Sequence, residues 1–333
     1  MSKVVLHIGT HKTATTTIQD MFHKNAPLLA QHGLIYPHLG RVTGHHGLVY
    51  DWSRLPPVYK PDIGSLDLFS QIARDHAGKD ATVFLSSEEF SRDVAGASVD
   101  FAAVRERLEA FDEIEVICVL RTQWQFLQSI YLELSRSSSP LRPSQITEPA
   151  IKGGNAMSLM VDYNLILDRL EKVFAPEEIT LLDYNVVGQG EGRILGAVLR
   201  HLGIDLKVDA LELVNDGFSN ISPHPLASWV SNIMAEPQKA PTWLVDCATE
   251  AFREEMGPDI VSCLFTQSEF DVLEKHFAPL NDRLAERRQA VQPGFSITPP
   301  DCTPIKLFRN QVHAPVWAKL TRILVRERMR AQK

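Results

Sequence analysis

Residues 4–17 of the chain read VVLHIGTHKTATTT. The apolar run at residues 4–8 is typical of a strand that is buried on both faces of a parallel sheet. Gly9 allows a tight turn, and apolar residues at helical spacing follow from about Thr16. The polar segment between strand and helix therefore wraps the first turn of a helix, where N–H groups and the positive end of the helix dipole attract anions.

The segment carries one cation and several hydroxyl groups. Lys12 provides a point charge, and the threonines provide hydrogen-bond donors. A helix cap needs only one hydroxyl, so several hydroxyls beside a lysine favour a binding site over a simple cap. We therefore predict that a phosphorylated small molecule binds here. The predicted binding residues are His11, Lys12, Thr13, Ala14, Thr15, Thr16 and Thr17.

The main alternative is the Gly-x-x-x-x-Gly-Lys-Ser/Thr loop of nucleotide-binding proteins. The chain has Lys12 and Thr13, but His11 stands where that motif has glycine, and no upstream glycine has the required offset. These departures argue against an ordinary nucleotide loop. An ATP- and magnesium-dependent small-molecule kinase and a non-catalytic nucleotide-binding protein of the same fold remain as alternatives.

The sequence HIGTHKTATTTIQ (residues 7–19) resembles the 5′-phosphosulfate loop of sulfotransferases that use 3′-phosphoadenosine 5′-phosphosulfate (PAPS). It is most similar to the bacterial members, whose loop commonly reads Lys-Thr-Gly-Thr-Thr. The chain departs at Ala14, where alanine is strained if φ is positive. The resemblance implies a P-loop-like α/β fold in three layers, with a central parallel sheet between two layers of helices. It also implies PAPS as co-substrate and no required metal.

A second motif supports this resemblance. Family members have an arginine at the end of a later strand and a serine eight residues on, and both bind the 3′-phosphate. Arg121 follows the apolar run 116–120, and Ser129 comes eight residues later. Ligands of open parallel sheets bind at the carboxyl ends of the strands, where an arginine presents a fork to phosphate. The C-terminal Arg-Lys-Gly loop of cytosolic animal members is not visible in this sequence.

Sulfuryl transfer needs a base for the acceptor's proton and positive charge near the leaving phosphate, and Lys12 suits the second role. Glu88 follows the buried run 83–85, and bacterial relatives often carry Ser-Ser-Glu there. His46 follows a Tyr-Pro element similar to one in the acceptor region of relatives. Histidine ordinarily titrates near ~6.5, whereas a glutamate base needs burial. The catalytic candidates are therefore Lys12 with Glu88 or His46, and we rank Glu88 first.

Composition excludes several classes of protein. The 333 residues carry 34 basic and 41 acidic side chains, for a net charge of −7, which argues against nucleic-acid binding. The four cysteines show no paired spacing, so we expect neither a zinc site nor a disulfide framework. The sequence shows neither a signal peptide nor an apolar run of ~18 residues, and we expect a cytoplasmic protein. The oligomeric state is not indicated.

Strand and helix patterns alternate along the chain, which predicts a parallel sheet. We expect a sulfotransferase domain over residues 1–290 and a C-terminal extension over 291–333, with a polar loop at 137–158. The extension contains an amphipathic helix after Pro315 with many basic residues. A docked helix with a solvated basic face is the favoured interpretation, and weak contact with an anionic membrane through 305–333 is the alternative. We expect strands at 4–8, 81–86, 114–120 and 179–183, and helices at 16–31, 65–77, 98–111, 123–136, 160–174 and 191–202.

The expected activity is transfer of a sulfuryl group from PAPS to a hydroxyl or amine. The acceptor could be a carbohydrate, a lipid or another small molecule, because the sequence does not show the shape of the acceptor pocket.

Overall fold

The computed structural model describes the chain apart from residues 94–97, 138–140, 215–222, 259, 300–304, 331 and 333. The chain forms two compact units. Unit 1 consists of Met1–Thr122, Met157–Asn220 and Pro279–Thr298, and unit 2 consists of Gln123–Ala156, Ile221–Ala278 and Pro299–Lys333. The domain boundary that we expect at residue 290 stays a prediction.

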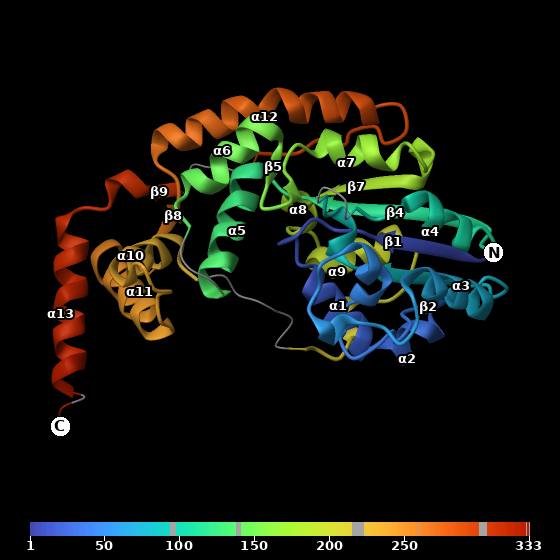
Figure 1. Ribbon diagram of the computed structural model, residues 1–333, viewed down its shortest axis with the longest axis horizontal. Helices are drawn as coiled ribbons and strands as arrows, with labels where there is room; N and C mark the ends of the chain where they lie inside the picture. The colour runs from blue at the N-terminus through green and yellow to red at the C-terminus, as the bar shows by residue number, and fades with distance from the viewer. Residues whose placement is uncertain are drawn as a thin grey trace. The chain divides into compact units, whose positions relative to one another are not determined.

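Most of the helices and strands are labelled in Figure 1. The strands are β1 Lys3–His7, β2 Leu34–Ile35, β3 Thr82–Ser86, β4 Glu113–Leu120, β5 Asn155–Ala156, β6 Leu159–Met160, β7 Ile179–Asp183, β8 Val261–Cys263 and β9 Ile305–Phe308. The helices are α1 Thr15–Lys24, α2 Ala26–Gln31, α3 Ser65–His76, α4 Phe101–Leu108, α5 Gln123–Ser137, α6 Ser144–Gly153, α7 Tyr163–Leu170, α8 Tyr184–Val187, α9 Arg193–His201, α10 Pro225–Ala235, α11 Thr242–Met256, α12 Gln267–Arg288 and α13 Ala314–Arg330.

Unit 1 is built on a five-stranded sheet in the order β2-β3-β1-β4-β7, and all its strand pairs are parallel. β1 is central, since Val4 pairs with Val83 on one side and with Ile114 on the other. The predicted α/β fold with a central parallel sheet is confirmed. The four predicted strands are also confirmed, each to within one residue at either end.

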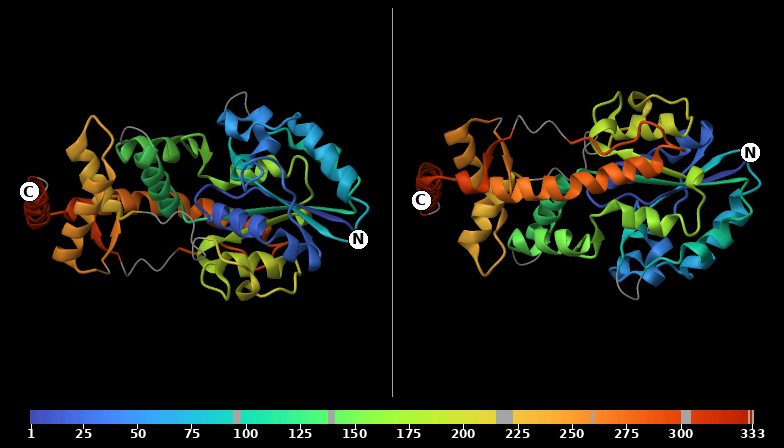
Figure 2. Two further views of the ribbon diagram at one scale, coloured as in Figure 1. Left: turned by 90° about the horizontal axis from the view of Figure 1, so that it is seen from below. Right: turned by 90° about the horizontal axis from the view of Figure 1, so that it is seen from above.

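Helices cover both faces of this sheet, as the two views in Figure 2 show. Alternate side chains of a strand point to opposite faces. Val4 and Leu6 pack in the cluster that includes residues of α3, α4 and α7, whereas Val5 packs with residues of α1, α2 and α9. This burial on both faces explains why the strands are continuous apolar runs. It also leaves the strand ends and the loops after them as the place for polar chemistry.

The predicted helix at 16–31 is wrong in one respect, because it divides into α1 and α2 at Asn25. Pro27 is at the start of α2, and a proline has no N–H to continue the hydrogen bonds of a preceding helix. The Asn25 side chain donates to the Met21 carbonyl at 2.8 Å and closes the end of α1. The predicted helices at 98–111 and 160–174 are shorter than expected, since Asp100 and Asp162 cap α4 and α7.

Unit 2 contains α5, α6, α10, α11 and α13, the parallel pair β8–β9, and the first half of α12. The predicted loop at 137–158 is wrong, because α6 occupies much of it; residues 138–140 lie outside the described residues. Ile146 and Ala150, four residues apart, are buried and hold α6 in place. The helices α10 and α11 and the strands β8 and β9 were not predicted from the sequence. None of the described helices combines the length and apolar character that crossing a membrane requires.

Candidate functional site

The predicted anion-binding loop joins β1 to α1 at the carboxyl end of the sheet. The N–H of Ile8 donates to the Ile117 carbonyl at 2.9 Å, and the N–H of Thr10 donates to the Val119 carbonyl at 3.1 Å. The Thr10 hydroxyl donates to the same carbonyl at 2.9 Å, and the Thr13 hydroxyl donates to the Thr10 carbonyl at 2.6 Å. The loop is therefore held over the end of β4. Two of its threonine hydroxyls stabilise the loop itself.

The loop backbone is strained at two residues. Lys12 has a φ of 65° and Ala14 a φ of 61°, both in the left-handed region that residues other than glycine rarely adopt. Ala14 precedes α1 and offers no side chain to cap it. Left-handed residues in such a loop turn neighbouring N–H groups toward a common point, as in anion-binding nests. Strain of this kind concentrates at functional sites. The departure from glycine at Ala14 therefore has a cost in backbone energy.

Ala14→Gly should stabilise the protein. Relief of a left-handed alanine is worth ~1–2 kcal/mol, and the added freedom of the unfolded chain offsets roughly 0.4–1 kcal/mol of this. We therefore expect the free energy of unfolding to rise by about 0.5–1 kcal/mol in urea denaturation. The matched control is Ala30→Gly in α2, at an exposed helical position, which should lower it by about 1 kcal/mol. Equal losses in both variants would contradict the strain at Ala14.

Three buried polar atoms at the loop have no hydrogen-bond partner among the described residues: His7 Nε2, His11 Nε2 and Thr15 Oγ1. Two of them face Gly9, where a Cβ would lie 2.8 Å from Thr15 Oγ1 and 3.7 Å from His7 Nε2. Gly9 is also left-handed, with a φ of 38°. A side chain at Gly9 would collide with the Thr15 hydroxyl. Glycine is therefore needed here both for backbone conformation and for space.

The protonation of His7 follows from its neighbours. Gln19 Nε2 donates to the Ser86 hydroxyl oxygen at 3.3 Å, so we assign the Ser86 proton to His7 Nδ1, 2.8 Å away. This assignment leaves the imidazole proton on Nε2, the atom that faces Gly9. Burial lowers the pKa of His7 to about 4, so the ring is neutral near pH 7. A neutral donor thus lies beneath the loop.

His45 is a second buried neutral histidine. Its Nδ1 accepts from the Ser86 N–H at 3.0 Å, and its Nε2 donates to the Pro37 carbonyl at 2.8 Å. The ring stacks on Tyr36 with centroids 4.3 Å apart. Burial lowers the pKa of His45 to about 3. Its two ring nitrogens fix the backbone of the loop around residue 37 against the end of β3.

These buried histidines predict acid destabilisation. Their pKa values are about 4 for His7 and about 3 for His45, below the ordinary 6.5, so the unfolded state binds more protons. Their contribution is complete above pH 6.5 and is lost as pH falls toward 4, at about 1.4 kcal/mol per pH unit for each histidine. Urea denaturation from pH 7 to 4.5 should show this slope. His45→Gln, which can keep both hydrogen bonds, should reduce the slope by one proton. An unchanged slope would exclude His45 as its source.

The two candidate bases lie at the carboxyl end of β3, in the same unit as the loop. Glu88 is partly buried and accepts from Gln19 Nε2 at 3.1 Å. His46 contacts the Ser87 hydroxyl through Nδ1 at 2.9 Å. Ser87 also accepts from the Glu89 N–H, so it caps the short 3-10 turn Glu88–Ser91. Each candidate base is therefore held by a polar neighbour.

Glu89, a buried acid–base group beside the loop, is not among the site residues predicted from the sequence. Glu89 is 8% exposed, and its Oε1 lies 3.8 Å from His11 Nε2. Its other oxygen accepts from Arg92 Nε. Burial raises the pKa of Glu89 against the opposing effect of Arg92. Burial and the charges of Arg92 and Lys12 hold the pKa of His11 well below its ordinary value. His11 is therefore neutral. For Glu89, the one indication in the sequence was the pair of glutamates, Glu88 and Glu89, directly after a strand.

Arg121, the predicted phosphate ligand, contacts the loop directly. Its Nη1 donates to the Lys12 carbonyl at 3.1 Å, and its guanidinium lies 5.0 Å from the centre of the Tyr184 ring. The Tyr163 hydroxyl donates to the Arg121 carbonyl. Burial lowers the pKa of Arg121, but a guanidinium remains charged at neutral pH. Tyr163 and Tyr184 were not predicted. Ser129 is buried on α5 in unit 2, and its pairing with Arg121 stays a prediction.

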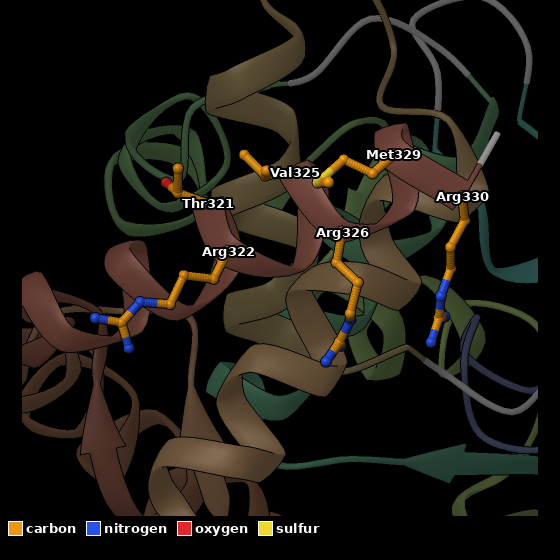
Figure 3. A pocket seen from close by; sticks show the side chains of 6 residues that line it. All are labelled: Thr321, Arg322, Val325, Arg326, Met329 and Arg330. Carbon is orange, nitrogen blue, oxygen red and sulfur yellow. The ribbon is translucent and has the colours of Figure 1, made fainter. Parts of the chain in front are cut away.

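The amphipathic helix of the C-terminal extension is α13. Leu320 and Ile323, on the apolar face of this amphipathic helix, are buried in the core of unit 2 with residues of α10 and α11. The opposite face has a shallow groove of about 420 Å³, shown in Figure 3. Arg326 pairs with Glu250 at 2.9 Å, which ties this face to α11. The groove is lined by two neighbouring rows of side chains, and within each row the residues are about one helical turn apart. The rows are Thr321, Val325 and Met329, and Arg322, Arg326 and Arg330.

Comparison with known proteins gives a structural likeness only. No family model matches the sequence, and no curated protein matches it. A sulfotransferase from Alicyclobacillus acidocaldarius is 13% identical with a TM-score of 0.41, over 73% of this chain and 95% of that one. The sulfotransferase domain of the Synechococcus PCC 7002 olefin synthase is 14% identical, with a TM-score of 0.35 and coverages of 74% and 94%. A sulfotransferase domain from the curacin biosynthetic pathway is 13% identical, with a TM-score of 0.36 and coverages of 83% and 96%. At these identities and TM-scores the likeness assigns no activity to the chain.

Proposed function

We propose that the chain is a PAPS-dependent sulfotransferase. The observation that carries this proposal is the contact between the two predicted anchors, in which Arg121 holds the Lys12 carbonyl at 3.1 Å. A donor with phosphosulfate at one end and a 3′-phosphate at the other needs two cationic groups on one edge of the sheet. The sequence spaces Lys12 and Arg121 by 109 residues, yet they meet in the fold. A nucleoside triphosphate such as ATP carries no 3′-phosphate, so a 3′-phosphate site would not contribute to its binding.

The polar atoms of the loop suit an anionic group. Thr15 Oγ1 is buried, has no partner among the described residues, and can donate. His7 Nε2, by our assignment, can also donate. Ligand oxygens would satisfy groups that are costly to leave unpaired in the interior. The N-terminal turn of α1 adds its dipole. We propose that His11, Lys12 and residues 13–17 bind the phosphosulfate, and that Arg121 with Ser129 binds the 3′-phosphate.

In the proposed reaction, an acceptor oxygen or nitrogen attacks the sulfur in line. The new bond to sulfur forms as the bond from sulfur to the phosphate oxygen breaks, and the leaving 3′,5′-adenosine bisphosphate keeps that electron pair. Lys12 stabilises the charge that develops on the leaving oxygen. Glu88, or alternatively His46, takes the proton of the acceptor. Lys12, Arg121 and the helix dipole provide the positive charge, so the proposal includes no metal.

Calorimetry tests the donor. The intact protein should bind 3′,5′-adenosine bisphosphate more tightly than ATP with magnesium, because only the former has a 3′-phosphate for Arg121. Tight binding of ATP alone would overturn the proposal in favour of a kinase. Transfer from ³⁵S-labelled PAPS to a panel of phenols, amines, glycans and lipids then tests catalysis. Donor binding without transfer to any acceptor would support the non-catalytic alternative.

We propose that α13 is a docked helix and not a membrane anchor. Among the residues that line the groove of α13, the apolar ones are Val325 and Met329, at 54% and 62% exposure. Leu320 and Ile323 are buried in the core of unit 2. In flotation with vesicles of phosphatidylcholine and 30% phosphatidylserine, the protein should stay in the unbound fraction. Flotation that disappears in Arg322→Glu would establish membrane contact instead. Glu106→Gln, an exposed change on α4, is the control.

A further inference from the structure

Unit 2 has a cavity of its own, of about 380 Å³, and all its lining residues belong to that unit. This volume lies within the range of roughly 300–1,000 Å³ that is usual for small-molecule sites. α5, α6, α10 and α12 contribute to its walls, together with the turn after β9. No part of the proposed sulfuryl transfer uses these residues. The polar and aromatic groups that argue for a ligand are Tyr131, Trp229, Asn232, Glu269 and Arg309.

The wall is organised around one guanidinium. Arg309 Nη2 contacts both carboxylate oxygens of Glu269, at 2.5 and 2.6 Å, and its guanidinium lies 5.7 Å from the centre of the Trp229 ring. Glu269 also accepts from the Thr266 N–H at 2.8 Å. These contacts fix a planar polar group beside an aromatic ring. Groups fixed in this way lose little conformational entropy when a ligand binds.

Hydrogen-bonding capacity remains in the wall. Asn232 is 3% exposed, and its Nδ2 donates to the Tyr131 hydroxyl at 3.2 Å. Its amide oxygen is a hydrogen-bond acceptor. Arg309 Nε is buried and lacks a partner within the described part of the chain. The cavity therefore offers one acceptor and one donor that a ligand can satisfy, and buried polar groups are rarely left unsatisfied.

The charges of the cavity cancel. Arg309 is paired with Glu269, and Arg142 lies 3.8 Å from Glu236 at the rim. A phosphorylated or sulfated ligand would have to compete with carboxylates for both guanidinium groups. A purely apolar ligand would leave the guanidinium of Arg309 unsatisfied. The ligand that fits has a face of C–H groups for an aromatic ring and several neutral hydroxyls for fixed polar groups.

We propose that this cavity binds a neutral saccharide unit. The C–H face of the sugar ring packs on Trp229, and its hydroxyls bond to Asn232, Tyr131 and the Arg309–Glu269 pair. The site is independent of the proposed sulfuryl transfer, because none of its residues belongs to the loop or to the candidate bases. It gives the chain a means of holding a glycan through unit 2.

Ligand-observed NMR with the full-length protein tests this proposal. The probes are the methyl glycosides of glucose, galactose, mannose and N-acetylglucosamine, each at millimolar concentration. At least one should receive saturation transfer on its ring protons, and Trp229→Ala should weaken its binding tenfold or more. Trp243→Ala, a change at a 57% exposed tryptophan on α11 in the same unit, should leave binding unchanged.

A second variant tests the same site in case Trp229→Ala does not fold. Ile233 lines the cavity and is 44% exposed, so Ile233→Trp can fill the cavity from its rim without loss of core contacts. This variant should also weaken binding tenfold or more, while binding of 3′,5′-adenosine bisphosphate in the same sample stays unchanged. Absence of transfer to all four glycosides would overturn the proposal, as would equal binding in Trp229→Ala and Trp243→Ala. Neither outcome bears on sulfuryl transfer.

Discussion

Lys12→Met should lower the rate of sulfuryl transfer by about 10²–10³-fold, the usual cost of removing one group that stabilises developing charge. Methionine keeps the length of the side chain and removes only its charge. Lys12 belongs to the loop that Arg121 and β4 hold in place, so the loop itself should persist. The measurement is the initial rate with labelled PAPS at saturating donor. Affinity for 3′,5′-adenosine bisphosphate, which has no sulfuryl group, should fall much less.

The backbone at Lys12 makes a second variant informative. Its φ of 65° is in the region that glycine adopts at no cost. Lys12→Gly therefore removes the charge and the strain together, while Lys12→Met removes the charge alone. If charge is the cause, both variants lose activity. Recovery of activity in Lys12→Gly would show that the loss in Lys12→Met comes from a displaced loop backbone and not from the missing charge. Lys24→Met is the matched control, because Lys24 is an exposed lysine that pairs with Glu212.

The sheet was predictable because strands buried on both faces have a strong sequence signal. The run at 116–120 is apolar at every position, and all its residues are buried. The end of such a run also locates the polar residue that follows, which is why Arg121 could be placed at the carboxyl edge. The break at Asn25 was harder to see, since the apolar pattern continues into α2 and only Pro27 indicates the division.

The support around the candidate site could not be predicted, because it depends on contacts between distant residues. Gln19 reads as one polar position on an amphipathic helix, yet its side chain reaches Glu88, 69 residues away. That contact exists only because β3 pairs with β1 in the sheet. Tyr163 contacts Arg121 across 42 residues for a similar reason. Polar side chains of this kind have no periodicity, so the sequence shows them only as ordinary members of helices.

The Gln19 contact makes the choice of base testable. Glu88→Gln should lower turnover by about 10²–10³-fold, within the range for loss of a general base. The amide oxygen of the new side chain can still accept from Gln19, so the position of the side chain is kept while its basicity is lost. Affinity for 3′,5′-adenosine bisphosphate should change less than twofold. Glu109→Gln, at an exposed carboxylate of unit 1, is the matched control and should leave turnover unchanged.

His46→Gln completes the comparison between the two candidate bases. Its amide can replace the contact of His46 Nδ1 with the Ser87 hydroxyl, so the local structure should persist. If Glu88 is the base, this variant loses less than tenfold in turnover and keeps the acidic limb of the pH–rate profile, whereas Glu88→Gln loses that limb. The reverse result would make His46 the base, and the proposed sulfuryl transfer would stand unchanged. Full turnover in both variants would mean that neither side chain takes the proton, and the buried carboxylate of Glu89 would then be the group to substitute, since burial already raises its pKa.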